Sequence, residues 1–111
     1  MSDLAKKKCV PCEGGTPPLR KDEVMKLLKE ASGWELSEKM DSISREFNFK
    51  DFKWAISFVN EVADLAEFEG HHPDIEIWYN RVKLTLSTHA IHGLSENDFI
   101  LAAKINTVEL N

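Results

Sequence analysis

Residues 50–73 read KDFKWAISFVNEVADLAEFEGHHP, and this stretch decides the fold. Its apolar side chains recur every three or four residues, the spacing of one helical face, which predicts a helix over residues 50–69. Further aromatic and aliphatic side chains widen the apolar arc to more than half of the circumference, which indicates burial on two sides. Gly70 and Pro73 end the helix, so His71-His72 lies at its exit.

Patterns of period two flank this helix on both sides. Apolar and polar residues alternate over 34–40 and 43–49 before the helix, and over 75–79 and 82–86 after it. Alternation of this kind is typical of strands that bury one face. Turn-forming residues separate the members of each pair, so the sequence predicts two β-hairpins.

Two further helices complete the expected order. An apolar stripe at helical spacing runs from Leu19 to Ala31, and Ser95 with Asp98 has the form of a capping box that begins a last helix. The order α-β-β-α-β-β-α predicts a two-layer α+β fold, with three helices on one face of a four-stranded antiparallel sheet. The sheet face that carries no helix, and the two sheet edges, must then either tolerate solvent or be covered by a partner chain.

Composition limits the class of protein. The chain has 111 residues and a formal net charge of −5, and 42% of its residues are hydrophobic. We therefore expect one soluble globular domain and no direct binding to nucleic acid. No apolar run is long enough for a transmembrane segment or a signal peptide, so we expect no membrane association and a cytoplasmic location.

Residues 1–18 differ in composition from the rest of the chain. They hold three consecutive lysines, paired glycines and prolines, and the motif Cys9-Val-Pro-Cys12, with almost no periodic apolar residues. Such a segment orders only by docking on something else, so we expect a flexible tail before a domain over 19–111. The CxxC pair is half of a zinc site or a lone redox pair, and the sequence holds no second CxxC. A second chain in a dimer, or a histidine, would have to complete a zinc site.

Three histidines are candidates for chemistry, because imidazole exchanges protons near neutrality. The plain interpretation of His71 and His72 is a helix terminus, and that of His89 is a loop residue; His92 is most simply a solvated turn residue. The spacing of the histidines does not favour a shared metal ion. The residues alone thus indicate a small α+β domain with a histidine acid/base pocket as one reading.

Several motifs together resemble the pterin-4a-carbinolamine dehydratase family. They are EFEGHHP at 67–73, Tyr79-Asn80, LSTH at 86–89 and GLSEND at 93–98, with Gly33-Trp34 and FNFKDF at 47–52. The resemblance covers about residues 19–110. It implies the α+β fold, and subunits that join edge to edge as homodimers or, through helices, as homotetramers.

The resemblance also implies an activity: dehydration of 4a-hydroxytetrahydropterin to quinonoid dihydropterin, which recycles the pterin of aromatic amino acid hydroxylases. An acid protonates the 4a-oxygen while a base removes a proton from the adjacent ring nitrogen. The resemblance implies no cofactor and no metal. A hydroxylase partner is a further expectation.

The site residues are carried over by resemblance. His71, His72 and His89 match the family's three active-site histidines. Of these catalytic residues we expect His71 and His89 to be the acid/base groups, with the assignment between acid and base open, and His72 mainly to hold and orient the pterin. Ser87 and Thr88 match positions that line the pterin pocket. Supporting or alternative roles fall to three more residues: Glu67 and Asp98 as groups that orient imidazoles, Asp98 also as a helix cap, and Trp34 as a stacking residue or a core residue.

The sequence departs from the family pattern at one position, and two alternative functions fit it. Gly70 stands where animal members commonly carry an aspartate beside the histidine pair, so a side-chain contact with the pterin is absent at this position and only a backbone contact would survive. Some animal relatives act as dimerisation cofactors of a transcription factor, so a pterin-binding or protein-binding module without turnover is the alternative. A third reading keeps the pocket and changes the pterin.

Overall fold

The computed structural model describes residues 3–9 and 17–108. The chain folds into two short 3-10 helices, three α-helices and four strands within these ranges. In chain order they are η1 (Asp3–Lys6), α1 (Lys21–Glu30), β1 (Glu35–Leu36), β2 (Ile43–Asn48), α2 (Phe52–Glu69), β3 (Asp74–Trp78), β4 (Arg81–Leu86), η2 (His89–Ile91) and α3 (Glu96–Ile105). The predicted order α-β-β-α-β-β-α is confirmed.

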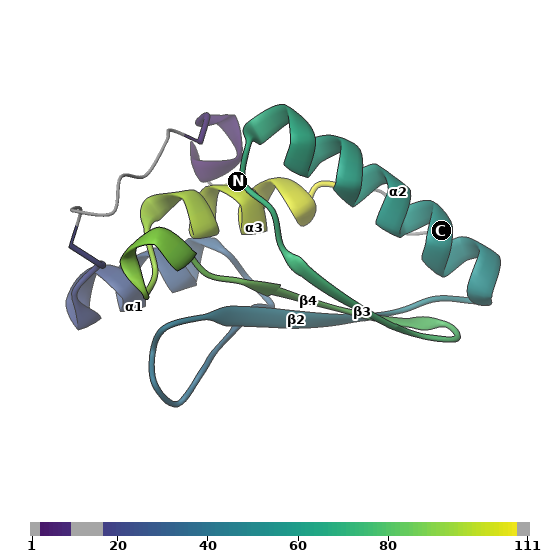
Figure 1. Cartoon of the computed structure of the whole chain (residues 1–111), viewed down its shortest axis with the longest axis horizontal. Helices are drawn as coiled ribbons and strands as arrows, with labels where there is room; N and C mark the ends of the chain where they lie inside the picture. The colour runs from purple at the N-terminus through teal and green to yellow at the C-terminus, as the bar shows by residue number, and fades with distance from the viewer. Residues whose placement is uncertain (1–2, 10–16, 109–111) are drawn as a thin grey trace.

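The four strands form one antiparallel sheet in the order β1-β2-β4-β3. β1 pairs with β2 and β3 with β4, which confirms both hairpins, and β2 pairs with β4 in the centre. All three α-helices lie on one side of this sheet (Figure 1). The two-layer α+β fold predicted from the sequence is therefore correct.

The first strand is shorter than its sequence pattern indicates. Alternation continues to Met40, but β1 ends at Leu36 because Ser37 folds the following residues into a loop. The Ser37 hydroxyl accepts hydrogen bonds from the backbone N–H groups of Asp41 and Ser42, and the backbone of Met40 has a left-handed φ of 60°. Local side-chain to backbone bonds thus replace ladder bonds in this segment.

The core lies between the sheet and the helices. Val82, Leu84 and Leu86 are fully buried at alternate positions of β4, which is the period expected of a strand with one covered face. α2 covers this face with a stripe at helical spacing, and almost every residue of α3 is buried. The β3 strand is different, since all five of its residues are exposed at the sheet edge.

α2 ends at Glu69, as the sequence predicts, and begins at Phe52, two residues after the predicted start. The Asp51 carboxylate accepts the backbone N–H of Trp54 at 2.9 Å, which caps the first turn. Gly70 ends the helix with a left-handed φ of 68°, and the next backbone N–H, that of His71, bonds back to the Ala66 carbonyl. This ending turns the chain sharply, so that His71 leaves the helix toward α3 and the sheet.

Residues 3–9 differ from the flexible tail predicted for this segment. η1 packs beside α3 (Figure 1). The side chains of Leu4 and Cys9 are buried. The Leu4 side chain is only 2% exposed, and it supplies the apolar surface that lets a short, polar segment dock on the domain. Cys12 and the rest of residues 10–16 lie outside the described residues.

No helix among residues 3–9 and 17–108 is both long and apolar enough to cross a membrane.

The left-handed turn at Gly70 gives a first prediction. A Cβ built at this position meets nothing within 4 Å, so Gly70→Ala changes only the backbone preference. We expect a loss of about 1 kcal/mol in the free energy of unfolding, measured by urea denaturation. Gly70→Asn should lose less, because asparagine tolerates this conformation. Equal stability of Gly70→Ala and wild type would show that residue 70 is not left-handed in solution.

Candidate functional site

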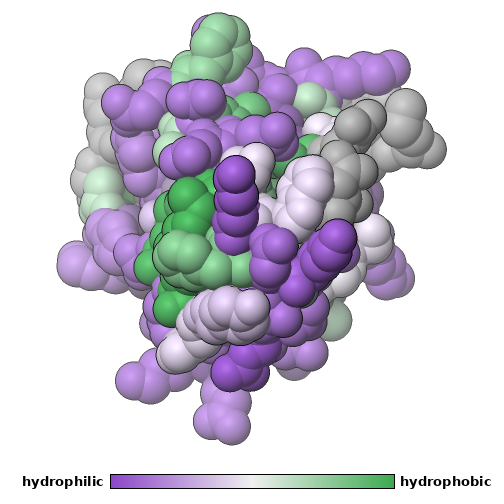
Figure 2. All heavy atoms as spheres, turned by 90° about the vertical axis from the view of Figure 1, so that its right-hand side faces the viewer, coloured by the Kyte–Doolittle hydropathy of each residue, from purple (hydrophilic) through white to green (hydrophobic). Residues whose placement is uncertain are grey.

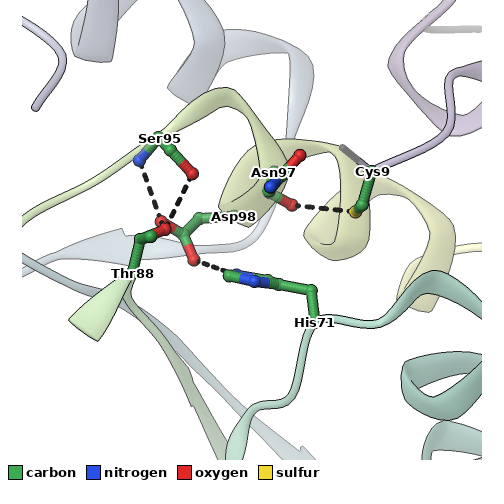
Figure 3. Close-up of polar contacts among 6 residues, drawn as sticks. All are labelled: Cys9, His71, Thr88, Ser95, Asn97 and Asp98. Atoms are coloured by element: carbon green, nitrogen blue, oxygen red, sulfur yellow. Dashed lines mark hydrogen bonds and ion pairs between the residues drawn. The ribbon is translucent and has the colours of Figure 1, made fainter. Parts of the chain in front are cut away.

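His71 lies at the junction of α2, α3 and the end of β4. Its Nε2 is 2.5 Å from Oδ1 of Asp98, in the first turn of α3, and its side chain is 12% exposed. The two residues are 27 positions apart in the sequence. Figure 3 shows the imidazole of His71 directed at the Asp98 carboxylate.

The Asp98 carboxylate is fully buried and bonded on both oxygens. Its Oδ2 accepts the Thr88 hydroxyl at 2.8 Å and the backbone N–H of Ser95 at 3.0 Å. The Ser95 hydroxyl in turn lies 2.7 Å from that of Thr88 (Figure 3). Ser95 and Asp98 form the predicted capping box, so Asp98 both caps α3 and contacts His71.

This arrangement selects one form of the His71 ring. A carboxylate only accepts hydrogen bonds, so the His71 nitrogen that faces Asp98, Nε2, carries a proton. In the neutral ring Nδ1 is then the basic nitrogen, and in the protonated ring the positive charge is paired with Asp98. A histidine fixed in this way can accept or donate a proton at a defined atom.

A cavity of about 380 Å³ lies beside this network. It is lined by Asp41, Ser42, Asp74, Thr85, Ser87, Thr88, His89, His92 and Gly93. Thr88 belongs to both the cavity wall and the Asp98 network, so it connects the two. The volume falls in the lower part of the range of small-molecule sites in proteins.

His89 reaches the cavity by a different route from the one the sequence suggested. A continuing strand would have placed it on one face with Ser87, but β4 ends at Leu86 and His89 begins η2. Both residues nevertheless line the cavity. His92, interpreted from sequence as a solvated turn residue, also lines it and has a left-handed φ of 53°.

His72 is in a separate environment from His71. Its Nε2 is 2.5 Å from Oε2 of Glu67, and both side chains are largely exposed, at 59% and 77%. Glu67, expected to orient an imidazole, therefore contacts His72 on the surface and is not the partner of His71, which is Asp98. An ion pair as exposed as this one contributes little to stability.

Trp34 lies in the core. It is 5% exposed, packs edge to face on Phe47, and donates its indole N–H to Asn106 at 2.9 Å. It is not among the residues that line the cavity. Of the two sequence interpretations, this arrangement corresponds to the core residue.

The described residues, 3–9 and 17–108, offer no cluster of metal ligands. In this part of the chain no group of three or more His, Cys, Asp or Glu side chains lies close enough to hold a metal ion. The predicted CxxC pair is divided, since Cys9 is buried and Cys12 lies outside these ranges.

Sequence reasoning missed Asp41, Asp74 and the cavity role of His92. Asp74 follows the motif His71-His72-Pro73 directly, which is a signal that it lies near the histidines. Asp41 carries no comparable signal, because it comes from the β1–β2 loop and reaches the cavity through the tertiary fold.

Comparison of the sequence with known proteins gives a consistent result. The family model described as pterin 4 alpha carbinolamine dehydratase matches residues 17–108. A protein of Nitrosomonas eutropha, named "Putative pterin-4-alpha-carbinolamine dehydratase", is 52% identical over 94% of this chain and 91% of its own length. A relative of the same name from Rubrobacter xylanophilus is 46% identical over 96% of this chain and 98% of its own.

Solved structures share the fold. A transcriptional coactivator/pterin dehydratase from Brucella melitensis superposes with a TM-score of 0.76 and 38% identity, over 80% of this chain and 95% of that one. A pterin dehydratase-like protein identified as a RuBisCO assembly factor in the alpha-carboxysome has a TM-score of 0.59, over 69% of this chain and 89% of its own. At 24% identity it shows a likeness of fold alone. On the family match and these relatives, the chain belongs to the pterin 4 alpha carbinolamine dehydratase family.

Proposed function

We propose that this protein dehydrates a 4a-hydroxytetrahydropterin to the quinonoid dihydropterin and water, by acid/base catalysis with His71 and His89. The observation that carries the proposal is the connection of a cavity that contains His89 to the buried pair of His71 and Asp98 through Thr88. Membership of the family supplies the reaction class.

The reaction needs two proton transfers. Hydroxide is a poor leaving group, so an acid protonates the 4a-oxygen as the C4a–O bond breaks, and a base removes the proton of the neighbouring ring nitrogen. The electron pair of that nitrogen forms the new double bond to C4a. Two imidazoles in opposite protonation states can perform both transfers without a metal or a cofactor.

His89 and His71 lie in different environments, which suit them to different proton-transfer roles. His89 is exposed to the cavity, where it can reach a bound ligand and exchange protons with water. His71 is mostly buried and fixed by Asp98, which defines its basic atom and balances its charge after protonation. His72, exposed and paired with Glu67, is assigned to holding the pterin at the site edge.

The polar lining supports a polar, flat ligand. Ser87 and Asp74 offer hydroxyl and carboxylate groups to the nitrogen and oxygen atoms on the edge of a pterin ring. The Thr88 hydroxyl already donates to Asp98, and its oxygen lies 2.7 Å from the Ser95 hydroxyl, so the buried network engages both its proton and its oxygen. We propose a reduced pterin as substrate and an aromatic amino acid hydroxylase as the partner that produces it.

Loss of the histidines tests the mechanism. We expect His71→Ala and His89→Ala each to lower kcat by about a hundredfold or more, because each removes a proton-transfer group, and the double variant to abolish turnover. His72→Ala should raise KM with a smaller change in kcat. The rate is followed by ultraviolet absorbance of freshly generated 4a-hydroxytetrahydropterin, after subtraction of the spontaneous reaction.

Added imidazole separates a chemical role from a structural one. Imidazole should partly restore the turnover of His89→Ala, because the removed His89 side chain lines the open cavity. It should not restore the turnover of His71→Ala, because the His71 side chain is only 12% exposed. Circular dichroism verifies that each variant folds, and Lys26→Ala on the exposed face of α1 is the matched surface control. Absence of acceleration by the folded wild type would contradict the proposal and favour a binding module without turnover.

We also propose that the chain acts as a homodimer or homotetramer. β3 is the last strand of the sheet, and its outer edge has no partner among the described residues. Ile75, Ile77 and Trp78 on this strand are 37%, 37% and 44% exposed. Figure 2 shows hydrophobic side chains gathered in a patch on the side of the molecule that holds the amino end of α2. An unpaired strand edge and an exposed hydrophobic patch both favour association between chains.

Light scattering after size-exclusion chromatography tests the assembly. We expect a mass of two or four chains of 12.7 kDa each for the wild type. Ile77→Lys should lower this mass, because a charge on an edge strand opposes pairing, whereas Ile77→Val should leave it unchanged. A mass of one chain for the wild type would contradict the proposal.

A further inference from the structure

The amino-terminal segment, defined here as residues 3–9, runs across the outside of α3 next to the site. Lys104 of α3 donates from Nζ to the Ala5 carbonyl at 2.8 Å, and Lys7 forms a 3.4 Å ion pair with Glu96 at the start of the same helix. Leu4 is buried against the domain at 2% exposure. The segment is therefore held along α3 by apolar and polar contacts.

Cys9, at the end of this segment, contacts two other parts of the chain. Its backbone N–H donates to Oε1 of Glu69 at 2.9 Å, and its Sγ donates to the backbone carbonyl of Asn97 at 3.6 Å. Glu69 is the last residue of α2, and Asn97 lies in the first turn of α3. Figure 3 shows the bond between Cys9 and Asn97 on the same turn that presents Asp98 to His71.

Charge balance holds Glu69 in place. Its side chain is 2% exposed, and its Oε2 lies 3.6 Å from the ammonium of Lys104. A carboxylate this deeply buried is stable only when it is paired and hydrogen-bonded, and Lys104 and the N–H of Cys9 supply both. Glu69 thus has a defined position, two residues before His71.

The thiol of Cys9 acts as a donor and a packing group. Burial, and next the nearby Glu69 carboxylate, raise the pKa of Cys9 from 9.0 to about 12. The thiol therefore keeps its proton at neutral pH and can donate it to Asn97. A protonated, buried thiol is also a poor nucleophile, which excludes a nucleophilic role for Cys9 in this state.

These contacts join the two elements that carry the site. His71 follows α2 and Asp98 begins α3, so their separation depends on how the end of one helix lies against the start of the other. Cys9 forms one hydrogen bond with Glu69, which lies two residues before His71. It forms another with Asn97, which directly precedes Asp98. A third segment attached to both neighbours limits the movement of His71 relative to Asp98.

We propose that Cys9 and Glu69 are positioning residues, through which the amino-terminal segment clamps the end of α2 to the start of α3 and holds the His71 imidazole against Asp98. The consequence for turnover rests on the proposed dehydratase function. The consequence for the His71 ring does not, because it follows from the contacts alone. The two can therefore be measured separately.

The first readout is the tautomer of His71. In histidine labelled with ¹⁵N, the neutral ring of wild type should show one protonated and one unprotonated nitrogen, because Asp98 fixes the proton on Nε2. Cys9→Ala removes the bond to Asn97, so the two ¹⁵N shifts of His71 should move toward each other. Cys9→Ser keeps a donor at this position and should retain the wild-type shifts.

A core variant distant from the site controls for general loosening. Val82 is fully buried on β4 and lies six residues before Thr88, about 20 Å along the chain direction. Val82→Ala removes more atoms than Cys9→Ala, and it should leave the His71 shifts unchanged. Unchanged shifts in Cys9→Ala, or equal changes in Cys9→Ala and Val82→Ala, would overturn the proposal.

Steady-state kinetics give the second readout. We expect Cys9→Ala to lower kcat about tenfold with KM within about twofold of wild type, because a misplaced catalytic group slows the chemical step while the cavity wall is intact. Cys9→Ser should restore most of kcat. If the His71 shifts respond as expected but the wild type has no dehydratase activity, the positioning stands and the proposed function fails.

The pKa of Cys9 gives an independent test of docking. Because the pKa in the folded protein is raised above 9.0 to about 12, the stabilising effect of the buried thiol is complete below pH 9 and is lost as pH rises through 12. The charged groups that face the thiol are Glu69 from α2 and Lys104 and Asp98 from α3, and all are present in Cys9→Ser.

The melting temperature of wild type should therefore fall relative to that of Cys9→Ser between about pH 9 and pH 12. Differential scanning fluorimetry in matched buffers measures this difference, and titration of lysine and tyrosine cancels between the two proteins. Parallel curves would mean that the thiol of Cys9 is open to solvent in the folded protein, which would overturn the proposal.

Discussion

The carboxylate of Asp98 is shielded completely from solvent, and its two oxygens accept hydrogen bonds from His71, Thr88 and Ser95. These donors come from the exit of α2, the segment after β4 and the residue that precedes α3. A buried carboxylate that lost one of these partners would be costly, so the three segments are held to one arrangement. The geometry of the cavity follows from this constraint, since Thr88 is part of its wall.

Two adjacent histidines show how strongly position determines chemistry. His71 and His72 are neighbours in the sequence, and each lies 2.5 Å from a carboxylate oxygen. The contact of His71 with Asp98 is almost completely buried. The contact of His72 with Glu67 is exposed to water, which screens the interaction between charges. The same residue type, with the same kind of partner, thus forms a fixed pair in one case and a loose surface pair in the other.

Much of the fold could be predicted because its signals are local. The two hairpins, the long helix ended by Gly70 and the capping box of Ser95 and Asp98 each depend on residues a few positions apart. The contact of Asp98 with His71 could not be derived from spacing, because it joins residues 27 positions apart. The docking of residues 3–9 escaped prediction for a related reason: Leu4 and Cys9 are too few to form a pattern, and their partners are distant in the sequence.

Gly70 has a consequence for how this site can diverge. It holds the chain in a left-handed conformation beside the histidine pair, and the space where a side chain would begin is empty. Aspartate and asparagine are the residues that enter this conformation most readily after glycine. A single change here can therefore add a carboxylate or an amide next to His71 and His72 without a new loop. The turn that ends α2 is thus an open position at which the polarity beside the histidine pair can be varied while the buried network remains as it is.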